Sequence, residues 1–241
     1  MQSCTGCDVP GRGGPSGSGG SSSDGGAGSG EGGAEEPSEF AVTRFEGPDF
    51  FITGPYSSGA TLRGERRGGG ESKGTWAGSG TVTLERLVSG AFVLVTPTDS
   101  TQDSLPTVLS LPENAEEEPL ELPLVRATVL DAIFTLPTLP VSAVEGRAQV
   151  VFRVGDLRTH LPRAGATITA AGAEVVLYSD GGTWSDAVTE TDPTGLVLIA
   201  NVPAAPWPGR LSTITVSGAV LGSVPYRAVE DAVSVVAAEL P

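Results

Sequence analysis

Three short apolar runs between residues 146 and 203 constrain the fold more than any other feature of this sequence. The runs span residues 148–154, 173–178 and 196–201, and clusters of Pro, Gly, Asp and Ser separate them. None of the segments between the runs repeats apolar residues at helical spacing. Short strands joined by such turns are typical of an antiparallel β-sandwich. The sequence therefore predicts a sandwich at the C-terminal end, over residues 141–241.

The rest of this C-terminal region agrees with a sandwich. Residues 211–217 alternate between apolar and polar side chains, and residues 233–236 offer a last strand. The turn Asp192-Pro193-Thr194-Gly195 has Pro at its second position and Gly at its fourth, which suits a type I turn. We therefore expect about seven strands around an aliphatic core.

Residues 38–140 predict a smaller β-rich region. Residues 40–45 alternate as in a strand, and residues 81–88 and 91–95, joined at Ser89-Gly90, predict a hairpin. The Gly-rich and charged stretch over residues 64–80 predicts a long exposed loop that carries Trp76.

One short helix is predicted near residues 124–135. Val125, Val129 and Ile133 recur at every fourth position, and Pro123 stands at the predicted start. The apolar stripe is as wide as that of an ordinary core helix, so we expect it to pack on a sheet. Binding of a partner by this helix is the alternative.

The net charge of −15 limits the partners of the chain. An acidic protein is repelled by a phosphate backbone and by anionic membrane surfaces, so we expect no nucleic-acid partner. We interpret the acidity as a device for solubility, with cation binding as the alternative, and the acidic run 113–118 as a solvated loop. Four carboxylates near turns of the C-terminal region are weak candidates for calcium, although their spacing matches no known calcium loop: Asp180, Asp186, Glu190 and Asp192.

Residues 1–37 predict a disordered tether. Twelve of the 28 residues from Pro10 to Pro37 are Gly and six are Ser, and none is a large apolar residue, so nothing offsets the entropy lost on ordering. No apolar run reaches the roughly 18 residues that a membrane-spanning helix needs. We expect no signal peptide within this sequence, since Met1-Gln2-Ser3 leaves no room for an apolar segment before Cys4. An export signal removed from this sequence, a different start site and a cytoplasmic location all remain open.

Cys4 and Cys7 form a C-x-x-C pair at the start of this tether. A zinc site needs four ligands, and the chain has no further Cys and a single His. A redox pair needs a strand–helix context, which a Gly/Ser coil does not supply. An early Cys after a small residue, followed by a Gly/Ser coil and a β domain, resembles bacterial lipoproteins, although no Leu stands three positions before either Cys. The resemblance implies lipidation at Cys4 or Cys7, a membrane anchor, and a place in the cell envelope.

Four short motifs in the C-terminal region resemble the carboxypeptidase-regulatory-like, transthyretin-like family. They are the strand Val150-Val151-Phe152-Arg153-Val154, then Pro162-Arg163-Ala164-Gly165-Ala166, Thr191-Asp192-Pro193-Thr194-Gly195, and Asn201-Val202-Pro203-Ala204. The chain departs from the family pattern at Pro206-Trp207-Pro208-Gly209. The resemblance implies an Ig-like or transthyretin-like sandwich that serves as a folding, adhesive or carbohydrate-facing module, without the catalytic zinc of carboxypeptidases.

The sequence offers little for catalysis. His160 is the only His and Lys73 the only Lys, so a Ser–His–Asp triad has one candidate base, which we expect in an exposed loop. The segment Tyr226-Arg227-Ala228-Val229 lacks the Tyr-Arg-Gly-Ser ending of the transthyretin-like hydrolases of urate breakdown. The C-terminal region has no Lys for an isopeptide crosslink, and no phosphate loop occurs. We therefore expect no enzyme and no cofactor.

Three tryptophans complete the set of candidate residues: Trp76, Trp184 and Trp207, all within Gly- or Pro-rich segments. A loop Trp more often closes the end of a sandwich, and we expect Trp184 to do so. An exposed ring would instead suit sugar stacking, for which Trp184 is the best single candidate. The sequence thus favours a non-catalytic cell-envelope lipoprotein, structural or binding, held by a lipid anchor and facing a cell-surface protein or polysaccharide. A carbohydrate-binding accessory module is the alternative, and an enzyme ranks third.

Overall fold

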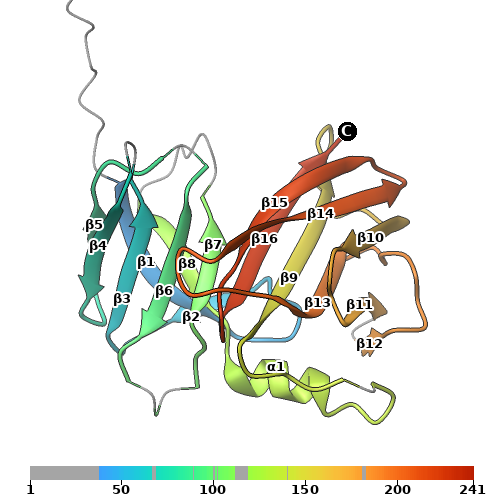
Figure 1. Cartoon of the computed structure of the whole chain (residues 1–241), viewed down its shortest axis with the longest axis horizontal. Coiled ribbons are helices and arrows are strands. Elements are labelled where there is room, and N and C mark those ends of the chain that lie inside the picture. Colours follow the sequence, from blue (N-terminus) through green and yellow to red (C-terminus); the bar gives the residue numbers. More distant parts are fainter. Residues whose placement is uncertain are drawn as a thin grey trace, which may run out of the picture. The chain divides into compact units, whose positions relative to one another are not determined.

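The computed structural model describes residues 38–66, 69–88, 90–99, 101, 103–111, 119–139, 141–180 and 183–241. The predictions for the tether 1–37, for Cys4 and Cys7, and for the acidic run 113–118 lie outside these residues. Within them the protein is mainly β, with one short helix, as the sequence predicts (Figure 1).

The elements, in chain order, are β1 (Ser38–Phe45), β2 (Thr53–Pro55), β3 (Ala60–Glu65), β4 (Glu71–Trp76), β5 (Val82–Leu84), β6 (Phe92–Pro97), β7 (Thr107–Ser110), β8 (Leu120–Leu124), α1 (Ala127–Phe134), β9 (Arg147–Asp156), β10 (Ala166–Ala170), β11 (Val175–Asp180), β12 (Thr183–Ser185), β13 (Leu196–Pro203), β14 (Arg210–Gly218), β15 (Gly222–Ala228) and β16 (Val233–Leu240).

A nine-stranded sheet runs through both halves of the described chain, in the order β12-β11-β13-β9-β16-β7-β6-β3-β4. The last strand, β16, lies between β9 and β7 and pairs with both in parallel. It therefore joins the region before residue 140 to the region after it, and residues 35–241 form one compact unit. A third parallel pairing joins β1 to β8. At these pairings the sandwich is mixed, whereas the sequence predicts an antiparallel one.

The C-terminal sandwich has its core between β9, β13 and β16 and a three-stranded sheet, β10-β14-β15. Phe152, Ile199 and Tyr226 are fully or almost fully buried there. The Tyr178 hydroxyl accepts a hydrogen bond from the Ile168 backbone N–H at 2.9 Å. Since Ile168 belongs to β10 and Tyr178 to β11, this bond ties the two sheets together at an edge whose backbone groups would otherwise be free.

Helix α1 lies within the predicted range of 124–135 and covers the opposite face of this half of the nine-stranded sheet, as predicted. No local side chain caps it, because Arg126 occupies the N-cap position. Asp103 supplies the cap from a distant loop by accepting a hydrogen bond from the Thr128 backbone N–H at 2.7 Å. Burial raises the pKa of Asp103, but hydrogen bonds from Thr128 and Arg126 outweigh it and hold the pKa below its ordinary value.

The predicted hairpin between residues 81–88 and 91–95 is wrong. Strand β5 pairs with β1, whereas β6 pairs with β3 and β7 in the nine-stranded sheet. Val82 and Leu84 do share one buried face, but that face packs onto Val93 across the core instead of continuing the same sheet. Arg86, with a positive φ of 54°, lies at the bend that separates the two strands.

The predicted exposed loop over residues 64–80 is also wrong, because residues 71–76 form β4. Ser72 and Trp76 point inward while Lys73 and Thr75 point outward, which is a strand alternation that the glycines conceal. Gly74 is required for close packing, since a Cβ there would lie 2.5 Å from Val82 Cγ2. The absence of a side chain at Gly74 lets β5 pack closely against β4, so this glycine does not indicate a loop.

The residues of the motifs that resemble the carboxypeptidase-regulatory-like pattern form hydrogen bonds that stabilise turns. Gly195 closes the predicted turn with a hydrogen bond to the Asp192 carbonyl at 3.0 Å, and its φ of +65° favours glycine. The Thr191 hydroxyl donates to the Arg163 carbonyl at 2.7 Å and accepts from the Ala166 N–H at 3.0 Å. Two segments of that pattern therefore meet in space and stabilise each other.

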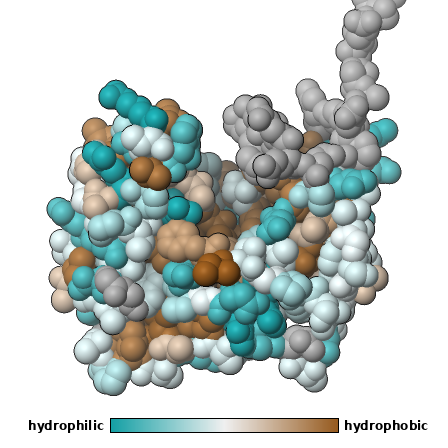
Figure 2. Space-filling view, turned by 180° about the vertical axis from the view of Figure 1, so that it is seen from behind, coloured by the Kyte–Doolittle hydropathy of each residue, from teal (hydrophilic) through white to brown (hydrophobic). Residues whose placement is uncertain are grey.

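The surface shown in Figure 2 is mostly polar, with hydrophobic residues gathered in its recessed parts. The one helix of the described residues has eight residues, too few to cross a membrane.

Candidate functional site

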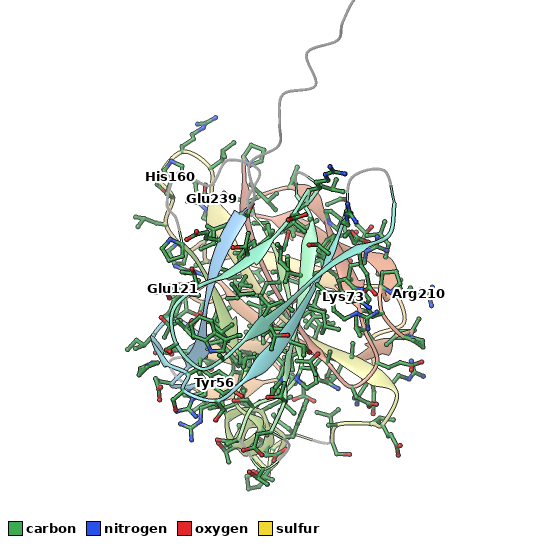
Figure 3. The ribbon with its side chains drawn as sticks, turned by 90° about the vertical axis from the view of Figure 1, so that its left-hand side faces the viewer. Tyr56, Lys73, Glu121, His160, Arg210 and Glu239 are labelled. Atoms are coloured by element: carbon green, nitrogen blue, oxygen red, sulfur yellow. The ribbon has the colours of Figure 1, made fainter. Side chains whose placement is uncertain are left out.

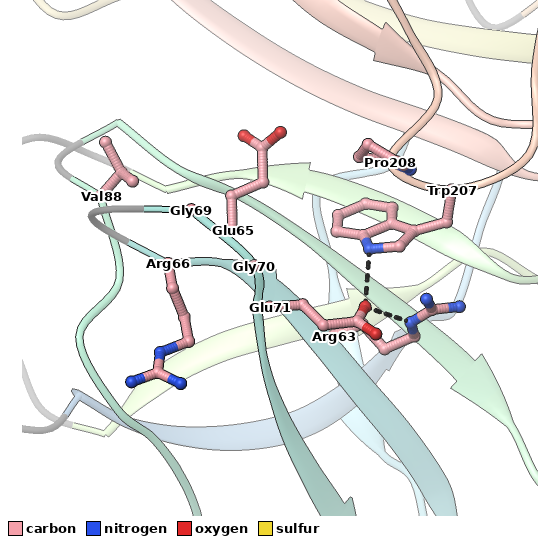
Figure 4. A pocket seen from close by; sticks show the side chains of 9 residues that line it. All are labelled: Arg63, Glu65, Arg66, Gly69, Gly70, Glu71, Val88, Trp207 and Pro208. Carbon is pink, nitrogen blue, oxygen red and sulfur yellow. Dashed lines mark hydrogen bonds and ion pairs between the residues drawn. The ribbon is translucent and has the colours of Figure 1, made fainter.

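A cleft of about 620 Å³ lies beside Trp207, between the β3–β4 hairpin and the β13–β14 loop (Figure 4). Its lining brings together residues far apart in the sequence: Arg63, Glu65, Arg66, Gly69, Gly70, Glu71, Val88, Trp207 and Pro208. We call it the Trp207 cleft. It combines an aromatic ring, two arginines and two carboxylates within one depression.

Trp207 is the only one of the three tryptophans that is partly exposed. A turn closed by the hydrogen bond from the Gly209 N–H to the Pro206 carbonyl, 2.8 Å, presents the side chain. Part of the ring packs on a small apolar cluster that includes Phe92 and Leu94. The indole Nε1–H donates to Glu71 Oε2 at 3.1 Å, so the ring is fixed at both ends while part of it faces solvent.

Glu71 is the centre of the polar contacts in the cleft. Its carboxylate accepts from Arg63 Nε at 2.7 Å, in addition to the Trp207 indole, and pairs with Lys73 Nζ at 2.7 Å. These hydrogen bonds, led by the one from Arg63, lower the pKa of Glu71 to about 2. The side chain is therefore ionised throughout the physiological range and acts as an acceptor.

The low pKa of Glu71 predicts a pH dependence for the cleft. A carboxyl whose pKa is lower in the folded state stabilises the fold above its ordinary value of 4.5, and this contribution is lost as the pH falls towards 2. We expect the NMR titration of the Glu71 carboxyl to have its midpoint near 2, and Arg63→Gln to raise that midpoint. A midpoint near 4.5 in the unmodified protein would contradict the contacts described above.

Trp184 and Trp76 are buried, each with 5% of its surface exposed. The burial of Trp184 agrees with the expectation that it closes the sandwich, but both residues lie in strands and not in the predicted loops. Trp184 lies in β12, and the Phe50 ring covers it edge-on at 6.4 Å between ring centroids. Trp76 ends β4 and packs on the core between the two N-terminal sheets. Neither ring has an exposed face on which a sugar could stack.

The four carboxylates considered for calcium do not gather into a site. Among the described residues, no group of three or more Asp, Glu, His or Cys side chains has a geometry that would hold a metal ion. Asp192 instead accepts hydrogen bonds from the Thr194 N–H, at 2.9 Å, and from the Ser179 hydroxyl, at 3.3 Å. It serves the turn, as Asp commonly does.

His160 lies in an exposed loop, as predicted, with 70% of its side chain exposed. Its Nδ1 lies 2.7 Å from Glu239 Oε2, and the two residues stand together at one end of the molecule, apart from Lys73 (Figure 3). The partner of the imidazole is a carboxylate and not a hydroxyl nucleophile.

Sequence reasoning missed Arg63, Arg66 and Glu71, because it assigned β4 to a loop. Two signals point to them. Residues 60–65 and 71–76 both alternate, and the chain departs from the family pattern at Pro206-Trp207-Pro208-Gly209, the segment that places Trp207 over the β3–β4 hairpin.

No model of a known protein family matches the chain, and no curated protein matches it. The resemblances to carboxypeptidase-regulatory-like domains and to bacterial lipoproteins therefore stay predictions, while the β-sandwich itself is present. Solved structures give distant matches. A Streptococcal ancillary pilin is 10% identical, with a TM-score of 0.25 over 85% of this chain and 69% of the pilin.

Two further matches are similarly distant. The shaft pilin SpaA from Lactobacillus rhamnosus GG is 14% identical, with a TM-score of 0.24 over 86% of this chain and 100% of the pilin. The Bacillus anthracis TIE protein is 14% identical, with a TM-score of 0.23 over 85% of this chain and 34% of that protein. Scores this low carry no argument about function, which must come from the residues of this chain.

Proposed function

We propose that the protein is a non-catalytic binding module of the cell surface and that the Trp207 cleft binds a saccharide chain. The observation that carries this proposal is the partly exposed Trp207 ring held against the Arg63–Glu71 pair. A sugar ring presents C–H groups that stack on an aromatic face, and hydroxyl groups that hydrogen-bond to charged side chains at its edge. The cleft offers both on fixed supports.

Binding fits this geometry better than hydrolysis does. A glycoside hydrolase needs a carboxylic acid whose pKa is raised so that it can protonate the leaving group. Glu71 has its pKa lowered to about 2, and Glu65 is ion-paired with Arg227. Glu71 can therefore accept hydrogen bonds from hydroxyls but has no proton to give to a leaving group.

Removal of the Trp207 ring tests the proposal. We expect Trp207→Ala to abolish retention by immobilised polysaccharides in affinity electrophoresis, because the stacking surface is lost. Trp207→Phe keeps an aromatic face without the indole N–H, so it should retain part of the binding. The matched control is Trp76→Phe, a change of the same kind at a buried ring. Equal retention of Trp207→Ala and the unmodified protein on every polymer that binds would contradict the proposal.

We further propose that a lipid on Cys4 or Cys7 holds this module at a membrane of the cell envelope. What supports it is the early Cys pair followed by a Gly/Ser-rich stretch without large apolar residues. In cells, we expect Cys4→Ser or Cys7→Ser to release the protein from membranes into the soluble fraction. Membrane association that persists in both single variants and in the double variant would show that anchoring does not depend on these residues.

A further inference from the structure

We infer that the ligand of the Trp207 cleft is an acidic saccharide chain, and that it continues from the cleft onto the outer face of the β3–β4 hairpin. This inference rests on the proposed saccharide binding and adds the charge of the ligand and its path.

The outer face of the hairpin provides the path. Thr61, Arg63 and Glu65 on β3 lie directly opposite Thr75, Lys73 and Glu71 on β4, and all six point away from the core. A second depression, of about 480 Å³, lies along this face and is lined by Thr61, Leu62, Arg63, Lys73, Gly74 and Thr75. Arg63 lines both depressions, so the two adjoin at this side chain and one extended ligand can contact both.

The charges along this path favour an anion. Arg63 and Lys73 are directly opposite each other, an arrangement of like charges that is unfavourable in a sheet. A single carboxylate, that of Glu71, compensates both of them. With the Glu65–Arg227 pair included, the described residues of this surface carry three cations and two carboxylates, an excess of one positive charge on a chain whose net charge is −15.

Lys73 is the group best placed to meet an acidic ligand. Its side chain is 64% exposed and lies on the outer face, directly opposite Arg63. An ammonium and a guanidinium side by side suit a carboxylate or sulfate group, which can accept hydrogen bonds from both. The Arg66 side chain extends to the other side of the hairpin from Glu65 and Trp207 and lies off this path (Figure 4).

The test compares matched pairs of polymers that differ in charge, using the full chain. Polygalacturonate is paired with its methyl ester, and dextran sulfate with dextran, so that carboxylate and sulfate sources are separated. We expect retention by the acidic member of at least one pair, weaker retention by its neutral partner, and loss of retention as salt is raised. The double variant Arg63→Gln/Lys73→Gln should bind the acidic polymer about tenfold more weakly. Arg147→Gln/Arg158→Gln removes the same charge from two exposed arginines outside the cleft and should bind as the unmodified protein does.

The outcomes separate this inference from the proposed function. Equal binding of acidic and neutral members, abolished by Trp207→Ala, would overturn the acidic ligand and leave saccharide binding intact. If both double variants lost binding equally, the net charge of the protein and not this surface would explain the effect. If polyglutamate were retained as strongly as polygalacturonate, the site would bind polyanions in general and not a saccharide. Both results overturn the inference, as does the absence of binding to both acidic polymers.

Discussion

Replacement of Trp184 by Ala is expected to destabilise the protein by about 3 to 5 kcal/mol, the usual cost of truncating a large buried aromatic side chain. The indole is 5% exposed and lies in the cluster that α1 covers, together with Leu177 and Leu198. The Phe50 ring packs on it edge-on. Because the neighbouring side chains are fixed by their own packing, they cannot move to fill the cavity that the truncation would leave. The measurement is equilibrium unfolding in urea, followed by circular dichroism.

Two control variants give the Trp184 experiment its reference points. Ile52→Ala removes a side chain that is 64% exposed in the turn beside Phe50, and should change the stability by less than about 0.5 kcal/mol. Trp184→Phe keeps an aromatic ring and should cost less than the change to Ala. If the Trp184→Ala protein were as stable as the Ile52→Ala protein, the ring would not be packed as described, and Trp184 would again be a candidate for sugar stacking.

The strands predicted from apolar runs are present. A strand buried on a sheet needs a run of apolar residues, and such a run is visible in the sequence. Strands β9 and β13 contain the apolar runs 148–154 and 196–201, β11 overlaps the run 173–178, and α1 follows its four-residue spacing. The wrong predictions concern segments in which glycine is compatible both with a loop and with close packing between strands. Gly74 was interpreted as part of a loop, whereas it admits the neighbouring strand β5.

Pairing was less predictable than the strands themselves. The proximity of residues 81–88 and 91–95 in the chain favoured a hairpin, but the partners of β6 are β3 and β7. Likewise, the sequence of β16 and its neighbouring residues does not indicate that this strand pairs with β7 and joins both regions into one sheet. These choices depend on which apolar faces meet in the whole fold, and a local pattern does not contain that information.

The candidate site was predictable only in part, for a similar reason. Trp207 was among the residues singled out, but its partners Arg63 and Glu71 are more than 130 positions away in the chain. A carboxylate in a Gly-rich segment resembles any solvated charge until the fold places an indole N–H and a guanidinium against it. The burial of Trp76 and Trp184 was likewise decided by β4 and β12, two short strands that the sequence did not reveal.

Replacement of Asn201 by Ala is expected to cost about 2 to 4 kcal/mol, from a buried amide left without its acceptor and from backbone strain together. The side chain is 3% exposed. Its Oδ1 accepts from Gln149 Nε2 at 2.8 Å and from the Val144 N–H at 3.0 Å, and its Nδ2 donates to Glu174 Oε2 at 2.7 Å. Truncation would leave the buried Gln149 amide without this acceptor, whereas Val144 and Glu174 are exposed and can turn to water.

The backbone of Asn201 separates the two contributions to this loss. Its φ is +54°, where the register between β13 and β9 shifts, a conformation that Asn and Gly tolerate better than Ala. Asn201→Gly removes the amide but adopts this φ freely, so it should be more stable than Asn201→Ala by about 1 kcal/mol and still less stable than the unmodified protein. If Gly restored full stability, strain alone would explain the effect and the amide network would contribute nothing. If Gly and Ala were equally destabilised, the loss would lie in the hydrogen bonds that fasten the segment before β9 to β13.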